Sequence, residues 1–96
     1  MTAREPKLDA DQFASISKAL ADPKRFDLLQ RLAEATDAPT CSSVCGWLGL
    51  APATVSHHLR ELETAGLVHI ERDGKFARIS LRRDVLAAYV KQLASL

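Results

Sequence analysis

Two cysteines are the residues of this sequence best suited to chemistry. Cys41 and Cys45 are separated by three residues, so on a helix they would lie one turn apart on the same face. Thiolates bind soft metals and metalloids and react with oxidants. One interpretation of the pair is therefore a thiol-reactive sensor. The other, which we favour, is a structural role, because free cysteine is among the residue types most often buried.

The surrounding sequence gives little support to metal or redox chemistry. A tetrahedral zinc site needs four ligands, and one chain offers two thiols. On a helix their β-carbons would stand about 5–6 Å apart, beyond the roughly 3.8 Å typical of a disulfide. Cys45 and His58 are spaced as in a two-cysteine, two-histidine zinc finger, but residues 62–64 lack the second histidine.

A thiol oxidoreductase is disfavoured as well. The cysteines lack the two-residue separation of thioredoxin-like motifs, and no βαβ pattern surrounds them. We therefore expect no cofactor, no metal, no small-molecule substrate and no enzymatic activity. Binding of a metal or metalloid at Cys41 and Cys45 is the less favoured alternative.

Length and composition restrict the class of protein. The 96 residues leave room for one domain, and 47% hydrophobic with 26% charged residues is an ordinary globular mixture. The net charge is only +1, so any attraction to nucleic acid must come from local charge clusters. No apolar run approaches the roughly 20 residues that cross a bilayer, and residues 1–9 are polar. We expect a soluble cytoplasmic protein without membrane contact.

Helical periodicity predicts two helices in the first third of the chain. The first covers about residues 9–20. The second begins at Asp22-Pro23, because Asp can cap a helix and Pro suits its first position, and it ends near Ala35. Its expected buried stripe comprises Phe26, Leu29, Leu32 and Ala33.

A helix-turn-helix signature follows at about residues 42–65. A short helix is closed by Gly49, and a second helix starts at Pro52 and stops at Ala65-Gly66. The connecting turn of about four residues containing glycine is typical of this motif. The apolar face of its second helix contains Val55, Leu59 and Leu62.

The pattern then changes to strands at about residues 67–81. Asp73-Gly74 between apolar runs predicts a β-hairpin. A last amphipathic helix is expected at about residues 84–95. The predicted fold is therefore mainly α with a small two-stranded hairpin, in a single domain covering residues 1–96.

Four segments resemble the ArsR/SmtB family of bacterial winged-helix repressors. They are residues 18–29 (KALADPKRFDLL), 54–62 (TVSHHLREL), 65–68 (AGLV) and 71–78 (ERDGKFAR). The similarity covers roughly residues 13–81 in order and spacing. It implies a homodimeric DNA-binding regulator with a winged helix-turn-helix fold, dimerising through its first and last helices. Family members usually leave DNA when a metal, metalloid or oxidant reaches a sensing site.

This sequence departs from the family's sensing sites. Arsenic-sensing members carry a denser cysteine cluster, and in this sequence only Cys45 aligns with one of those thiols. The family's site on the terminal helix uses acidic and histidine residues. Here Asp84 is present but no histidine follows His69, so we expect no zinc or nickel site there.

The resemblance places double-stranded DNA against the second helix of the motif and against the hairpin. Hydroxyl and cationic side chains can contact phosphates and base edges there. Between the adjacent histidines, we favour His57 over His58, whose role in the family can include packing. The candidate DNA-binding residues are Thr54, Ser56, His57, His58, Arg60, Arg72, Lys75 and Arg78.

The same resemblance suggests which apolar side chains hold two copies together. In a chain this small, we expect the apolar faces of the first and last helices to be covered by a second copy. Packing within the chain is the alternative. The candidate dimer-interface residues are Phe13, Ile16, Leu86, Tyr89, Val90 and Leu93.

The predicted function is a homodimeric, sequence-specific transcriptional repressor that binds an inverted-repeat operator and is released by a signal the sequence does not identify. The alternative is a winged-helix module that binds a protein partner and does not bind DNA specifically. Loss of DNA affinity in a folded variant with Arg72 and Arg78 replaced would distinguish the two.

Overall fold

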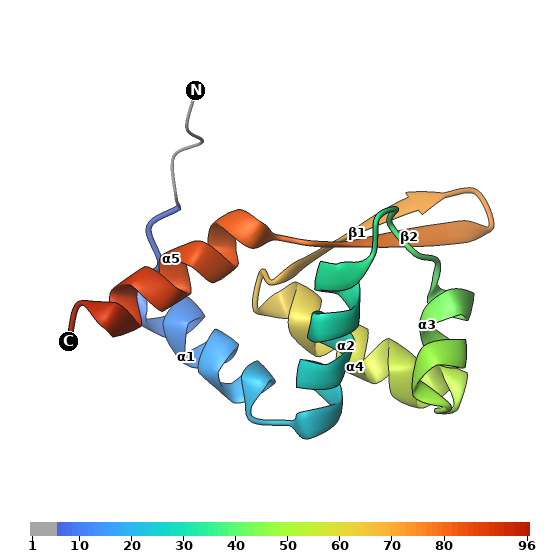
Figure 1. Cartoon of the computed structure of the whole chain (residues 1–96), viewed down its shortest axis with the longest axis horizontal. Helices are drawn as coiled ribbons and strands as arrows, with labels where there is room; N and C mark the ends of the chain where they lie inside the picture. Colours follow the sequence, from blue (N-terminus) through green and yellow to red (C-terminus); the bar gives the residue numbers. More distant parts are fainter. Residues whose placement is uncertain (1–5) are drawn as a thin grey trace.

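The computed structural model describes residues 6–96. In chain order these residues form α1 (Ala10–Leu20), α2 (Pro23–Glu34), α3 (Cys41–Leu48), α4 (Pro52–Thr64), β1 (Val68–Asp73), β2 (Phe76–Leu81) and α5 (Arg83–Ala94). The hairpin of β1 and β2 projects beyond the helices, and its turn lies at the end of the molecule opposite the chain terminus after α5 (Figure 1). The predicted fold class, mainly α with an antiparallel hairpin, is confirmed.

Local sequence signals explain where the helices begin and end. The carboxylate of Asp22 accepts hydrogen bonds from the amides of Lys24 and Arg25, at 2.8 and 3.3 Å, while Pro23 occupies the first position of α2. Gly49 ends α3 in the left-handed conformation, at φ 63°, which a residue with a side chain adopts at a cost. These signals act over a few residues, so they can be read before the tertiary structure is known.

The core lies where the helices meet the inner face of the hairpin. Apolar side chains from all five helices, from the segment before β1 and from both strands are buried together. Burial of this kind contributes about 25 cal/mol per Å² of apolar surface and is the main source of stability. The largest fully buried side chains are Ile16, Leu28, Val44, Val55, Leu62, Leu67 and Ile79.

The buried face of α2 differs from the predicted stripe. Leu29 and Leu32 are buried as expected, but Phe26 is 47% exposed and Ala33 is exposed. Leu28 is fully buried in their place. Periodicity defines a stripe only to within about one residue, and the packing of α2 against several elements decides which edge of it faces inward.

The hairpin has a regular register. Residues 68–73 pair with residues 76–81 from Val68↔Leu81 to Asp73↔Phe76, and Gly74 turns the chain at φ 59°. Phe76, next to this turn, is 63% exposed. The outer edge of β2 is covered in part by the loop between α2 and α3, because the amide of Ile79 donates to the Pro39 carbonyl at 2.9 Å.

Within the described residues, none of the helices combines the length and apolar character that crossing a membrane requires.

Candidate nucleic-acid interface

Helix α4 presents a polar face held in place by an apolar one. Val55, Leu59 and Leu62 are buried in the core, so the opposite side of the helix must face outward. Four of the predicted DNA-binding side chains are exposed on that side: Thr54, Ser56, His57 and Arg60. Helix α4 also starts at Pro52 without a side-chain cap, which leaves its first-turn amides open to an external acceptor.

His58 does not belong to this exposed face, and its prediction as a DNA-binding residue was wrong. Its side chain is 7% exposed, and its Nδ1 atom is buried with no hydrogen-bond partner among the described residues. The helical step of about 100° per residue separates it from His57, which is exposed. His58 therefore acts in packing.

The hairpin supplies the second set of predicted cations. Arg72 at the end of β1 and Lys75 in the turn are exposed. Arg78 is exposed too, but its Nη1 atom donates to the Ala38 carbonyl at 3.0 Å. The Arg78 guanidinium therefore connects the loop before α3 to β2. Arg72 and Lys75 are more available than Arg78 to bind an external anion.

A hollow of about 210 Å³ separates α4 from the hairpin. We call it the α4–β1 hollow. Two arginines, one glutamate, one serine and one cysteine line it together with two apolar residues. The lining residues are Cys41, Ser56, Leu59, Arg60, Glu63, Ile70 and Arg72. Sequence reasoning grouped Cys41 with Cys45 and did not foresee that the fold places it beside Arg60 and Arg72.

Comparisons with known proteins identify the family. A model of the helix-turn-helix domain family matches residues 20–71. The HTH-type transcriptional regulator YceK of Bacillus subtilis is 30% identical over 77 residues, covering 80% of this chain and 77% of YceK. An ArsR-like transcriptional regulator from Rhodococcus sp. RHA1 superposes with a TM-score of 0.79 at 26% identity, covering 88% of this chain and 78% of that one. The protein belongs to the ArsR family of winged helix-turn-helix transcriptional regulators.

A further solved relative bears on assembly. The homodimeric winged helix-turn-helix DNA-binding domain Mb0332 from Mycobacterium bovis has a TM-score of 0.73 and 28% identity, covering 88% of this chain and 79% of that domain. In the fold of this ArsR-family regulator, α4 is the second helix of the helix-turn-helix and the hairpin is the wing.

The predicted dimer-interface residues divide into two groups. Ile16 is fully buried inside the protomer, so its prediction as an interface residue was wrong. Tyr89 is buried by contacts within the chain: its ring centroid lies 4.7 Å from that of Phe13, and its hydroxyl lies 2.7 Å from the Ser17 hydroxyl. These contacts hold α1 against α5.

The other interface candidates line the outer side of α5. Leu86 is half-buried, whereas Val90 and Leu93 are 55% and 43% exposed. A broad shallow hollow on this helix is lined by Arg83, Leu86, Ala87, Val90 and Lys91.

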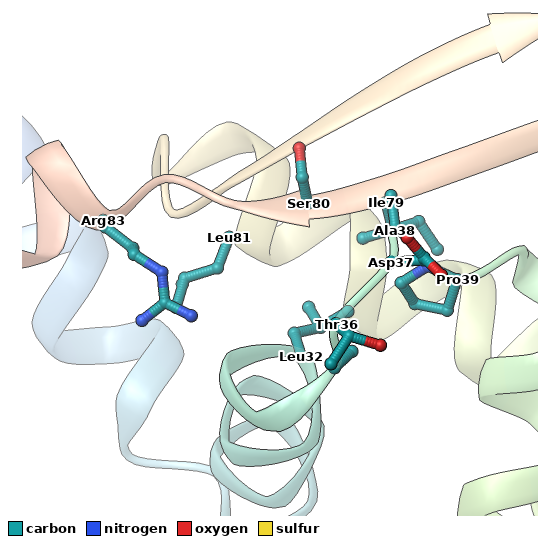
Figure 2. Close-up of a pocket in the computed structure, with 10 residues that line it drawn as sticks. Leu32, Thr36, Asp37, Ala38, Pro39, Ile79, Ser80, Leu81 and Arg83 are labelled. Carbon is teal, nitrogen blue, oxygen red and sulfur yellow. The ribbon is translucent and has the colours of Figure 1, made fainter.

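A separate hollow of about 250 Å³ lies where α2, β2 and α5 meet (Figure 2). Its labelled side chains come from the end of α2, the following loop and the end of β2, with Arg83 at the start of α5. The Nη2 atom of Arg83 donates to the Ala33 carbonyl at 2.8 Å, so this residue ties α5 to the last turn of α2. The contact fixes α5 relative to α2.

Acidic residues at two helix starts have lowered pKa values. Desolvation raises the pKa of Asp22, but the amides of Lys24 and Arg25, the positive charge of Arg25 and the nearby His58 together lower it below 3.8. At α5, hydrogen bonds from the Arg82 guanidinium, one of them 2.9 Å long, lower the pKa of Asp84. Both groups therefore stabilise the folded protein as carboxylates.

The two cysteines are both half-buried and pack against the core. Among residues 6–96, no group of three or more histidine, cysteine, aspartate or glutamate side chains is placed to hold a metal ion.

Proposed function

We propose that this ArsR-family regulator is a homodimeric repressor that binds an inverted-repeat operator on double-stranded DNA. The observation that carries the proposal is the exposed polar face of α4, with Thr54, Ser56, His57 and Arg60, next to a wing with two unengaged cations. A helix anchored by its apolar side can place its first turns in a major groove, where hydroxyl groups can contact base edges and a guanidinium group can contact a base edge or a phosphate. Bound across a promoter in the cytoplasm, the dimer would block RNA polymerase.

The proposed dimer follows from the exposed apolar side of α5. Val90 and Leu93 lie on it, and a second copy related by a twofold axis would bury the same patch from both chains. Two α4 helices would then have to stand about 34 Å apart to enter successive major grooves on one side of the DNA. A single protomer with a net charge of +1 has little non-specific attraction to DNA, so the dimer is needed for affinity.

Fluorescence anisotropy tests DNA binding. The purified reduced protein is titrated onto DNA from immediately upstream of its own gene and onto a scrambled duplex of the same composition. We expect tighter, strongly salt-dependent binding to the upstream DNA. A double variant, Thr54→Ala with Ser56→Ala, should lose the preference and keep the weaker binding to the scrambled duplex. Equal binding of the wild-type protein to both duplexes, at several upstream fragments, would refute a sequence-specific repressor.

Val90→Glu tests the dimer. Because Val90 is 55% exposed in the protomer, the substitution leaves the monomer's core intact and places a charge in the proposed interface. We expect light scattering to show a monomer with an unchanged circular dichroism spectrum and at least about 100-fold weaker operator binding, equivalent to about 2.7 kcal/mol. The matched control is Ala33→Glu on the exposed side of α2. An unchanged dimer mass for Val90→Glu would refute the interface.

A further inference from the structure

The arginines of this protein fall into two sets. Five of those in the described residues, Arg25, Arg31, Arg78, Arg82 and Arg83, contact a carboxylate or a backbone carbonyl of the chain. Arg60 and Arg72 have no hydrogen-bond or ion-pair partner within residues 6–96. These two line the same α4–β1 hollow, one from α4 and one from β1.

Two unpartnered guanidinium groups beside one hollow create a local excess of positive charge. The hollow contains one carboxylate, Glu63, which forms no ion pair with either arginine. Like charges held near each other repel, and an anion bound between them removes that cost. Guanidinium groups match the oxygens of a phosphate in geometry, and two of them can bind one phosphate from two sides.

The position of the hollow identifies which phosphate would be bound. The inference rests on the proposed function, with α4 in a major groove and the wing in the adjacent minor groove. Neighbouring grooves of a duplex are separated by one sugar-phosphate backbone, so that backbone must cross the protein surface between α4 and β1. The α4–β1 hollow lies on this path.

We propose that Arg60 and Arg72 together clamp one DNA backbone phosphate in the α4–β1 hollow. Arg60 is then a residue that positions the protein on DNA, and sequence reading is left to Thr54, Ser56 and His57. The clamp also links the two DNA-contacting elements, because one phosphate is held from α4 and from the wing at once. The Cys41 thiol, in the same hollow, is covered when DNA is bound.

Salt-dependent anisotropy of four variants tests the clamp. Arg60→Gln, Arg72→Gln and the double variant are compared with Arg31→Gln, which removes the same charge from α2, where Arg31 already contacts Asp27. Each single variant should bind both the upstream and the scrambled duplex about 10-fold more weakly, with an unchanged ratio between them. In the double variant the clamped phosphate is no longer neutralised, so the slope of log affinity against log salt should fall by about 0.9 per protomer, or about 1.8 per dimer.

The double variant distinguishes one shared phosphate from two independent ones. If both arginines hold the same phosphate, removing the second costs less than removing the first, and the combined loss is smaller than the product of the single losses. Fully multiplicative losses would overturn the shared clamp. So would affinities equal to that of wild type, or a loss confined to the upstream duplex, since the latter would make Arg60 a base-reading residue.

Alkylation of single-thiol variants gives an independent readout. N-ethylmaleimide adds to a thiol by forming a carbon–sulfur bond, the thiol hydrogen passing to the neighbouring ring carbon, and mass spectrometry follows the rate. With Cys45→Ala, saturating scrambled duplex should slow alkylation of Cys41 at least about 10-fold, as expected for a residue at the contact. With Cys41→Ala, alkylation of Cys45 is the control and should change little. Equal rates at Cys41 with and without DNA would overturn the clamp.

These tests separate failure of the clamp from failure of the proposed function. A phosphate contact is independent of sequence, so the arginine variants and the alkylation assay can be read on the scrambled duplex. Binding without sequence preference, still weakened in Arg60→Gln and Arg72→Gln, would refute the sequence-specific repressor and support the clamp. Absence of binding to any duplex at low salt would overturn both. If inorganic phosphate alone then slowed alkylation of Cys41, at an ionic strength held constant with chloride, the α4–β1 hollow would be a binding site for a free anion.

Discussion

Replacing His58 with leucine should stabilise this regulator without weakening DNA binding. The side chain is buried beside Val55 and Leu62 on the inner side of α4, and its Nδ1 atom lacks a partner among the described residues. A polar atom buried without a hydrogen bond retains its full cost of desolvation. Leucine is similar in size, has no polar atom and is a better helix former than histidine.

The expected gain can be worked out from these terms. An unsatisfied buried polar group costs about 1–3 kcal/mol, and the difference in helix propensity adds a few tenths of a kcal/mol in the same direction. The different shapes of the two side chains oppose this by up to about 1 kcal/mol. We therefore expect the free energy of unfolding to rise by about 1 kcal/mol, which corresponds to about 4–8 °C in Tm for a domain of this size.

The assay is thermal and urea unfolding followed by circular dichroism at one protomer concentration, because the stability of any oligomer depends on concentration. Operator affinity is measured in parallel. The matched control is His57→Leu, whose exposed side chain should leave stability within about 0.5 kcal/mol while operator affinity falls. A loss of more than about 1 kcal/mol, or weaker operator binding by His58→Leu, would refute the assignment of His58 to packing alone.

Two further predictions concern helix ends and turns. Asp22→Ala should lower the free energy of unfolding at neutral pH by about 1 kcal/mol through loss of the cap of α2. The folded pKa of Asp22 lies below 3.8, so the stabilisation by its carboxylate is complete above that value and is lost as the pH falls through the folded pKa. The loss of stability in Asp22→Ala should therefore be smaller in acid than at neutral pH. Urea unfolding at neutral and at acid pH measures this loss, and an equal loss at the two pH values would contradict the role of the charge. Gly66→Ala should lower the free energy of unfolding by about 1–2 kcal/mol because Gly66 has a positive φ. The loss should be larger unless Gln12 moves, since the new Cβ would lie 2.7 Å from the Gln12 Nε2 atom. The control Gly46→Ala, in open space on α3, should stabilise by about 0.5–1 kcal/mol; a stability change of the same sign in both variants, measured by thermal unfolding, would argue against strain at Gly66.

The helices and the hairpin could be predicted from the sequence because their boundaries depend on residues that are adjacent in the chain. Asp22-Pro23, Gly49 and Asp73-Gly74 each define a helix start, a helix end or a turn within a few residues, and the structure places these features there. The exposed face of α4 followed from the same periodicity. These interactions need no knowledge of the rest of the fold.

Other features depend on contacts between distant residues and could not be predicted. The burial of Ile16 and of His58 is decided by how α1 and α4 pack. The bond from Arg78 to Ala38 spans 40 residues. The α4–β1 hollow likewise combines residues from α3, α4 and β1. Cys41, which the sequence analysis paired with Cys45, therefore lines the same hollow as Arg60 and Arg72.

The loop between α2 and α3 has a consequence for how the protein behaves at high concentration. A two-stranded hairpin has open edges, and an open edge is a template for strands of other molecules. Through the bond between Ile79 and Pro39 and the bridge of Thr40 to Arg78, the loop occupies the edge of β2 near the core. The exposed tip beyond it carries Glu71, Asp73 and Lys75, and charged side chains discourage edge-to-edge pairing. Shortening this loop would free a strand edge and should make the regulator aggregate while its helices remain folded.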